Sequence, residues 1–305
     1  VKQIKNLSMD EEILILITDV NLTENESKDL DKKIKKLLDM GYKIKLQLLD
    51  HHATGQKSAN SYDWYYLDTT KCATKIVYEY LYKEFNAFKD EIHAWIKPLV
   101  DSINAIDIWV EEETKNFEFG KVLLSMISKV REINNVLFAS QNRDFRIHLL
   151  KVAATYIGQD NDNIKLDNDI HKIKKEYLRL DDNDNTIDNL SAIYLVNSLE
   201  NIKETLTIEY KGHKGLLTYC LGSISIPSNA FLKANLDYDF FIDIGRKGHT
   251  SLRADGKVDV SYIAQKLANG GGHVNASGCK FDDFKESKEY EVVRTYVQNK
   301  LKAIE

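Results

Sequence analysis

An aspartate followed by two histidines, Asp50, His51 and His52, is the cluster of this sequence best suited to chemistry. The three residues follow an apolar, strand-like run from Ile44 to Leu49 and precede a predicted turn. Imidazole and carboxylate groups are ligands for manganese, iron or zinc, and successive side chains at a strand end can diverge into one cleft. The pattern therefore predicts a transition-metal site.

Two further carboxylates are candidate ligands. Asp19 lies near the end of another apolar run, from Glu12 to Val20, although an aspartate in such a position often only caps the next turn. Asp107 lies among apolar neighbours, so it is expected to emerge from a packed segment. An unpaired carboxylate is costly there, which favours a metal or cation partner.

A second cluster, far downstream, is rich in glycine and predicts a phosphate site. Its residues are Gly270, Gly271, Gly272 and His273. Consecutive glycines allow the backbone to approach a ligand closely, and the histidine can touch a phosphate. Arg246 and Arg253 lie just upstream and are typical of a phosphate or carboxylate clamp. The alternative is an exposed hairpin with solvated cations.

The elements that must position the first cluster form a strand–helix–strand unit. Glu12–Val20 and Lys43–Leu49 are predicted strands, and Asn25–Met40 between them has apolar residues at helical spacing. A unit of this length implies parallel strands and a right-handed crossover. Ligands bind at the carboxyl ends of such strands, where Asp19 and Asp50 both fall.

The rest of the chain predicts an α/β protein with a helical middle. Helices are predicted at 70–85, 89–107 (interrupted or bent near Pro98), 120–136, 143–156 and 164–180. The acidic stretch 181–188 is a predicted loop and domain boundary. Beyond it, strands are predicted at 189–197, 205–210, 215–221, 239–244 and 250–254, with helices at 228–234, 260–268 and 286–304. We therefore predict a metal-binding domain over residues 1–120, a connector over 121–188 and a second domain over 189–305.

Composition excludes several classes of protein. The formal net charge is -5, which argues against binding long nucleic acid by bulk charge but permits a short nucleotide. Three widely spaced cysteines form neither a zinc pattern nor a disulfide framework, which indicates a reducing cytoplasm. No apolar run is long enough to span a membrane.

These motifs together resemble the DHH/DHHA1 phosphoesterase family. Asp19 matches the family's second motif, and Asp50-His51-His52 matches the third. Asp107-Ile108-Trp109 is similar to the fourth, in the version of the oligoribonuclease-like (nano-RNase B type) branch. Ser251-Leu252-Arg253, the glycine cluster and Ala276-Ser277-Gly278 match the second domain. The resemblance covers essentially the whole chain.

The resemblance implies a DHH domain with a parallel sheet, a helical connector and a smaller α/β DHHA1 domain. It further implies hydrolysis of short RNA oligonucleotides by two Mn²⁺ ions that activate water. The ions would be held by Asp19, Asp50, His51 and Asp107, with His52 and Asp50 as catalytic residues. The substrate's far phosphate or sugar would be held by Arg246, Arg253, Gly270, Gly271, Gly272 and His273.

One motif of the family is missing from this chain. An Asp-x-Asp motif should precede the strand that ends at Asp19, and we expect the native protein to carry it upstream of Val1. Three alternatives stay open: a bisphosphonucleoside phosphatase, a phosphodiesterase of cyclic-dinucleotide products, and a nucleotide-binding module with a degenerate metal site. A homodimer is compatible with the sequence.

Overall fold

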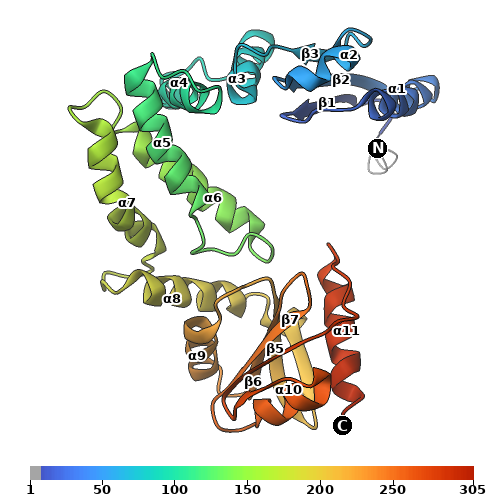
Figure 1. Cartoon of the computed structure of the whole chain (residues 1–305), viewed down its shortest axis with the longest axis vertical. Helices are drawn as coiled ribbons and strands as arrows, with labels where there is room; N and C mark the ends of the chain where they lie inside the picture. The colour runs from blue at the N-terminus through green and yellow to red at the C-terminus, as the bar shows by residue number, and fades with distance from the viewer. Residues whose placement is uncertain (1–7) are drawn as a thin grey trace. The chain divides into compact units, whose positions relative to one another are not determined.

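The structure, a computed structural model, describes residues 8–305 (Figure 1). It confirms the predicted α/β class. The chain forms two compact units: one holds the residues up to Ser128 together with Leu150–Asn168, and the other holds Lys129–Leu149 and Asp169–Glu305. The chain passes between the units within the segment that the sequence assigned to a helical connector. No helix among residues 8–305 has the length and apolarity needed to cross a bilayer.

The first unit contains a three-stranded parallel sheet of order β1-β2-β3, which confirms the predicted strand–helix–strand unit. Its elements are β1 (Glu12–Thr18), α1 (Glu24–Asp39), β2 (Lys43–Asp50), η2 (Ala53–Gly55), α2 (Gln56–Ala59), β3 (Tyr65–Leu67), α3 (Ala73–Phe85), η3 (Glu91–His93), α4 (Ile96–Asp107) and α5 (Thr114–Ser128). Helices α6 (Ala139–Ala154) and α7 (Asp162–Leu178) each run from one unit into the other.

Helix α1 begins with a capping box. The Thr23 hydroxyl accepts from the Glu26 backbone N–H, and the Glu26 carboxylate accepts from the Thr23 backbone N–H. This exchange satisfies two donors that a helix start otherwise leaves without partners. The helix buries Ile34 and Leu37 and joins β1 to β2, so the carboxyl ends of these strands lie at one edge of the sheet.

The helical middle differs from the prediction in two places. The helix predicted over 89–107 is interrupted, but the break falls before Pro98: the short turn η3 is followed by α4, and Pro98 lies in the first turn of α4 without losing a helical hydrogen bond. The helix predicted over 120–136 is α5, which begins earlier and places Gly120 in its interior. A Cβ at Gly120 would lie 2.4 Å from the Ser102 carbonyl oxygen, so this glycine serves close packing of α5 on α4.

The second unit contains a six-stranded sheet of order β4-β5-β6-β7-β9-β8, in which only β5 and β6 pair parallel. Its elements are α8 (Ile187–Glu200), η4 (Lys203–Leu206), β4 (Thr207–Tyr210), β5 (His213–Tyr219), α9 (Ser225–Ala234), β6 (Phe240–Ile244), β7 (His249–Ala254), α10 (Val260–Ala268), β8 (Gly271–His273), β9 (Ala276–Lys280) and α11 (Tyr290–Lys302).

The strand predicted over 189–197 was wrong, because this segment lies within α8. Thr186 caps the helix by accepting from the Asn189 N–H, and the buried residues Leu190, Leu195 and Leu199 recur at helical spacing. The β-branched and aromatic residues of the segment favour a strand locally, but packing decides the outcome.

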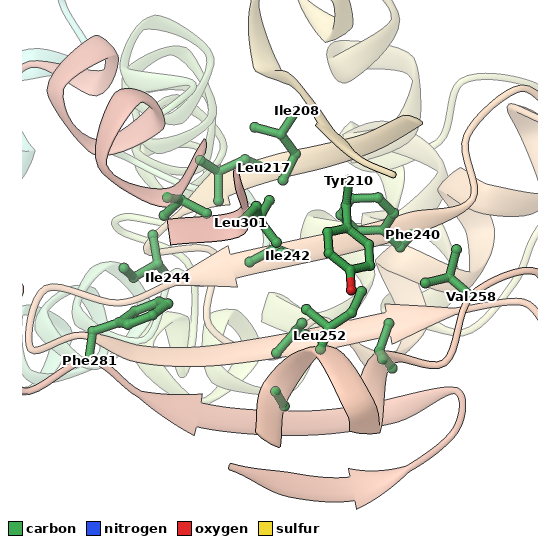
Figure 2. Packing of buried hydrophobic residues seen from close by; sticks show 14 of the residues in the cluster. Ile208, Tyr210, Leu217, Phe240, Ile242, Ile244, Leu252, Val258, Phe281 and Leu301 are labelled. Carbon is green, nitrogen blue, oxygen red and sulfur yellow. The ribbon is translucent and has the colours of Figure 1, made fainter. Parts of the chain in front are cut away.

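One face of the six-stranded sheet carries the core of this unit. Side chains such as Leu217, Ile242 and Leu252 are fully buried there, together with residues of α10 and α11 (Figure 2). The opposite face carries Phe241 on β6, and the residues that align with it on β7 and β9 belong to that same face.

Candidate metal centre

Asp19 follows β1 in a left-handed backbone conformation, with φ 57°. Aspartate is among the few non-glycine residues that adopt this conformation readily. Its backbone N–H donates to the Leu49 carbonyl oxygen at 3.1 Å, which extends the β1–β2 pairing by one residue. The side chain is 63% exposed, so its carboxylate is open to solvent and to a ligand.

His51 brings the two predicted carboxylates together. Its Nε2 lies 3.3 Å from Asp19 Oδ1 and 3.7 Å from Asp107 Oδ2. Asp107 is the last residue of α4, so it arrives from an element far along the chain. His52 joins the group, because Asp19, His51 and His52 each offer a ligand atom within 4.8 Å of the others. Within residues 8–305, no other group of three or more histidine, cysteine or acidic residues has its ligand atoms this close together.

Asp50 lies behind the histidines and is fully buried. Its Oδ1 lies 2.7 Å from His52 Nδ1, and its Oδ2 accepts a hydrogen bond from the Tyr65 hydroxyl at 2.8 Å. Both carboxylate oxygens are therefore engaged, and Nε2 is the nitrogen of His52 that remains for a ligand. For Asp50, which the resemblance gave as a metal ligand and catalytic residue, this geometry supports a role in orienting His52.

Tyr65 was not among the candidate residues of the sequence analysis. It lies on β3, beside Leu48 of β2, and this pairing brings its hydroxyl to Asp50. Gly55 leaves the necessary space, because a Cβ there would lie 2.3 Å from the Tyr65 hydroxyl oxygen. A tyrosine on a short strand gives no local signal of this role, since only the strand order reveals it.

The hydrogen bonds polarise the pair formed by Asp50 and His52. Burial by itself raises the pKa of Asp50, but the hydrogen bonds from His52 and Tyr65 outweigh it and leave this pKa below its usual range. The hydrogen bond to Asp50 raises the pKa of His52, against the opposing effect of burial. Asp50 is thus held as a carboxylate that stabilises positive charge on His52.

The donor set fits a divalent transition metal. Asp19 and Asp107 offer carboxylate oxygens, and His51 and His52 offer imidazole nitrogens. Such mixed nitrogen and oxygen ligands suit manganese, iron or zinc. A carboxylate that binds one nitrogen of a histidine, as Asp50 binds Nδ1 of His52, fixes the ring and is a usual support of a metal site.

In the second unit, the strand register aligns Arg253 with His273. Arg253 on β7 and His273 on β8 both pair with Ala276 of β9, so the three residues form one row on the same face of the sheet. The Arg253 guanidinium also donates to the Ser225 hydroxyl at 3.0 Å. Arg246 lies in the turn between β6 and β7, 3.5 Å from a Glu286 carboxylate oxygen, and is outside this row.

The three consecutive glycines do not all meet the same packing constraint. A Cβ at Gly270 would lie 2.3 Å from the Gly278 carbonyl oxygen, and one at Gly272 would lie 2.5 Å from the Ala276 carbonyl oxygen. The close approach of β8 to β9 therefore requires both. Gly271 has no atom within 4 Å of such a Cβ, so packing within the protein does not require a glycine there.

Comparison with known proteins shows that this chain belongs to a phosphodiesterase family. The chain is 40% identical over 291 residues to a 3′,5′-cyclic-nucleotide phosphodiesterase of Helicobacter pylori, with 95% of this chain and 83% of that protein covered. The crystal structure of an uncharacterized protein from Helicobacter pylori G27 matches with a TM-score of 0.89 at 39% identity, over 99% of this chain and 86% of that one. No family model matches the sequence.

Proposed function

We propose that this protein is a Mn²⁺-dependent phosphodiesterase that hydrolyses small nucleotides, first of all 3′,5′-cyclic mononucleotides. The observation that carries the proposal is the meeting of Asp19, His51, His52 and Asp107 at the carboxyl end of a parallel sheet. The activity named for the 40% identical relative supports the choice of substrate. The DHH/DHHA1 resemblance supports manganese and the use of two ions.

Asp19, Asp107 and His51 would hold the metal. When bound, it would lower the pKa of a water molecule and stabilise negative charge on the phosphoryl group. Hydrolysis forms a bond from the water oxygen to phosphorus and breaks one ester bond from phosphorus to a ribose oxygen. That oxygen must take up a proton. His52 Nε2 is the group that can carry it, while Asp50 holds the ring in place and stabilises its positive charge.

A second candidate substrate is short RNA, cleaved from one end. The row of Arg253 and His273 favours it, because these groups can bind a second phosphate. A bisphosphonucleoside or a linear product of a cyclic dinucleotide would use the same row. All three carry a phosphate that a 3′,5′-cyclic mononucleotide lacks.

The test is hydrolysis by purified protein with Mn²⁺ of 3′,5′-cyclic mononucleotides, 5′-phosphorylated short RNA, a bisphosphonucleoside and linear dinucleotides. We expect the cyclic mononucleotides to be cleaved. His51→Ala should lower turnover by orders of magnitude and reduce bound Mn²⁺. His93→Ala is the matched control, because His93 also pairs with an aspartate, Asp90, but belongs to η3.

Three outcomes would contradict the proposal. Turnover of His51→Ala equal to that of wild type would remove the metal assignment. Cleavage restricted to RNA would transfer the proposal to the second candidate. Nucleotide binding without any hydrolysis, in protein loaded with Mn²⁺, would identify a nucleotide-binding module.

A further inference from the structure

Trp109 is the most exposed aromatic residue that the structure describes, with 64% of its surface open to solvent. It lies two residues after Asp107, which ends α4 and whose carboxylate lies near His51. Two residues span at most about 7 Å of chain, so the indole begins within reach of a nucleotide whose phosphate lies at the metal centre.

The indole is held in place despite its exposure. Its Nε1 donates to a Glu111 carboxylate oxygen at 2.8 Å, and its ring lies 5.1 Å from the buried ring of Phe117 with the planes at 84°. The backbone of Trp109 is left-handed, with φ 59°, a costly conformation for a bulky residue and one that tends to occur at functional sites. The Trp109 ring is therefore a large apolar surface that is exposed to solvent, held in one orientation and close in sequence to the candidate metal centre.

We propose that Trp109 is the residue on which the substrate's base stacks, a proposal that rests on the proposed function. A fixed, exposed indole next to a phosphate site is suited to a planar base. The local charge also favours a base over a phosphate at Trp109. Glu112 and Glu113 follow Glu111, and these carboxylates would repel a phosphate but not a neutral base. Purines offer the larger ring for stacking, so purine nucleotides should be preferred over pyrimidine nucleotides.

The kinetic test compares Trp109→Ala and Trp109→Phe with wild type. The substrates are a purine 3′,5′-cyclic nucleotide and methyl riboside 3′,5′-cyclic phosphate, which has no base. Trp109→Ala should raise KM for the purine substrate about tenfold with little change in kcat, and Trp109→Phe should restore most of the loss. The base-free substrate should respond to neither variant. Phe85→Ala, which removes another exposed aromatic ring, at the end of α3, is the control.

A binding measurement separates this proposal from the proposed function. A purine nucleoside monophosphate should quench tryptophan fluorescence of the wild type, with and without Mn²⁺. The quenching should be lost in Trp109→Phe, although Trp64 and Trp95 remain. Quenching without hydrolysis of any substrate would overturn the proposed function and leave base stacking in place.

Two results would overturn base stacking itself. The first is an equal rise in KM for the substrates with and without a base. The second is an unchanged KM combined with a changed oligomeric state of Trp109→Ala in sedimentation, which would show that the indole covers a protein interface.

Discussion

At the scale of single residues, the site depends on how Asp50 is used. Its two oxygens are bound by His52 and Tyr65, and it has no exposed surface. The hydrogen bond from Tyr65 leaves Asp50 oriented towards His52 and lowers its pKa. Tyr65 therefore acts on His52 through Asp50. It helps to position His52 Nε2, the atom that we expect to face metal or substrate.

Tyr65→Phe should lower Mn²⁺ affinity or kcat by about 10- to 100-fold, because groups that support a metal ligand typically contribute that much. Metal titration and steady-state kinetics measure the two effects, and circular dichroism checks the fold. Tyr66→Phe removes the hydroxyl of the neighbouring tyrosine, which is 47% exposed, and should leave both unchanged. Wild-type metal affinity and kcat in Tyr65→Phe would mean that Asp50 orients His52 unaided.

At the scale of elements, the turn η2 packs against β3 at the Tyr65 side chain. Gly55 ends this turn, and the space above its Cα is filled by the Tyr65 hydroxyl. In the second unit, Asp239 just before β6 is bound by His213 of β5 and by Lys257, at 2.9 and 3.1 Å. Both contacts join segments that are separate in sequence, so each can be tested by a single substitution.

Gly55→Ala should displace Tyr65 from Asp50 and destabilise the first unit by about 1–3 kcal/mol, because the added methyl group has no room. The double variant Gly55→Ala, Tyr65→Phe lacks the clashing oxygen. It should be more stable than additivity of the two single variants predicts. Thermal unfolding of the four proteins measures the coupling, and strict additivity would show that the clash is relieved in another way.

Asp239→Asn should lower the free energy of unfolding by about 1 kcal/mol at neutral pH. Burial by itself raises the pKa of Asp239, but the contacts with His213 and Lys257 lower it below 3.8. A lowered folded pKa gives stability that is present above pH 3.8 and lost as the pH falls through the folded value. The difference between variant and wild type should therefore narrow in acid. A constant difference across denaturant titrations at several pH values would contradict this.

At the scale of the whole molecule, each unit carries its own set of polar residues. The candidate metal ligands belong to the first unit, and the row of Arg253 and His273 belongs to the second. For substrates that carry a second phosphate, we expect a division of labour in which the first unit binds metal and the second unit binds that phosphate.

Arg253→Ala and His273→Ala should each raise KM for substrates with a second phosphate and leave Mn²⁺ affinity unchanged. Arg246→Ala is the informative comparison, because sequence reasoning grouped Arg246 with these residues but the structure places it in the β6–β7 turn. Arg246→Ala should raise this KM less than Arg253→Ala or His273→Ala does. A collapse of Mn²⁺ binding in the Arg253 or His273 variant would refute the division of labour.

The sequence by itself determined the features that depend on neighbours along the chain. The apolar strands, the helix between them and the run from Asp50 to His52 are local patterns, so they predict the parallel unit and the place of the candidate metal ligands at its edge. Local propensity was misleading where packing decides, as in α8, whose leucines are buried along one side of a helix.

Only the tertiary structure decided which distant groups meet. It brings Asp107 from the end of α4 to His51, and it brings the Tyr65 hydroxyl to Asp50 through the order of the strands. It also assigns Gly270 and Gly272 to the close approach of β8 and β9, where their sequence alone suggested a ligand. The physical reason is that each of these contacts depends on strand register or on the packing of separate elements, which no local pattern encodes.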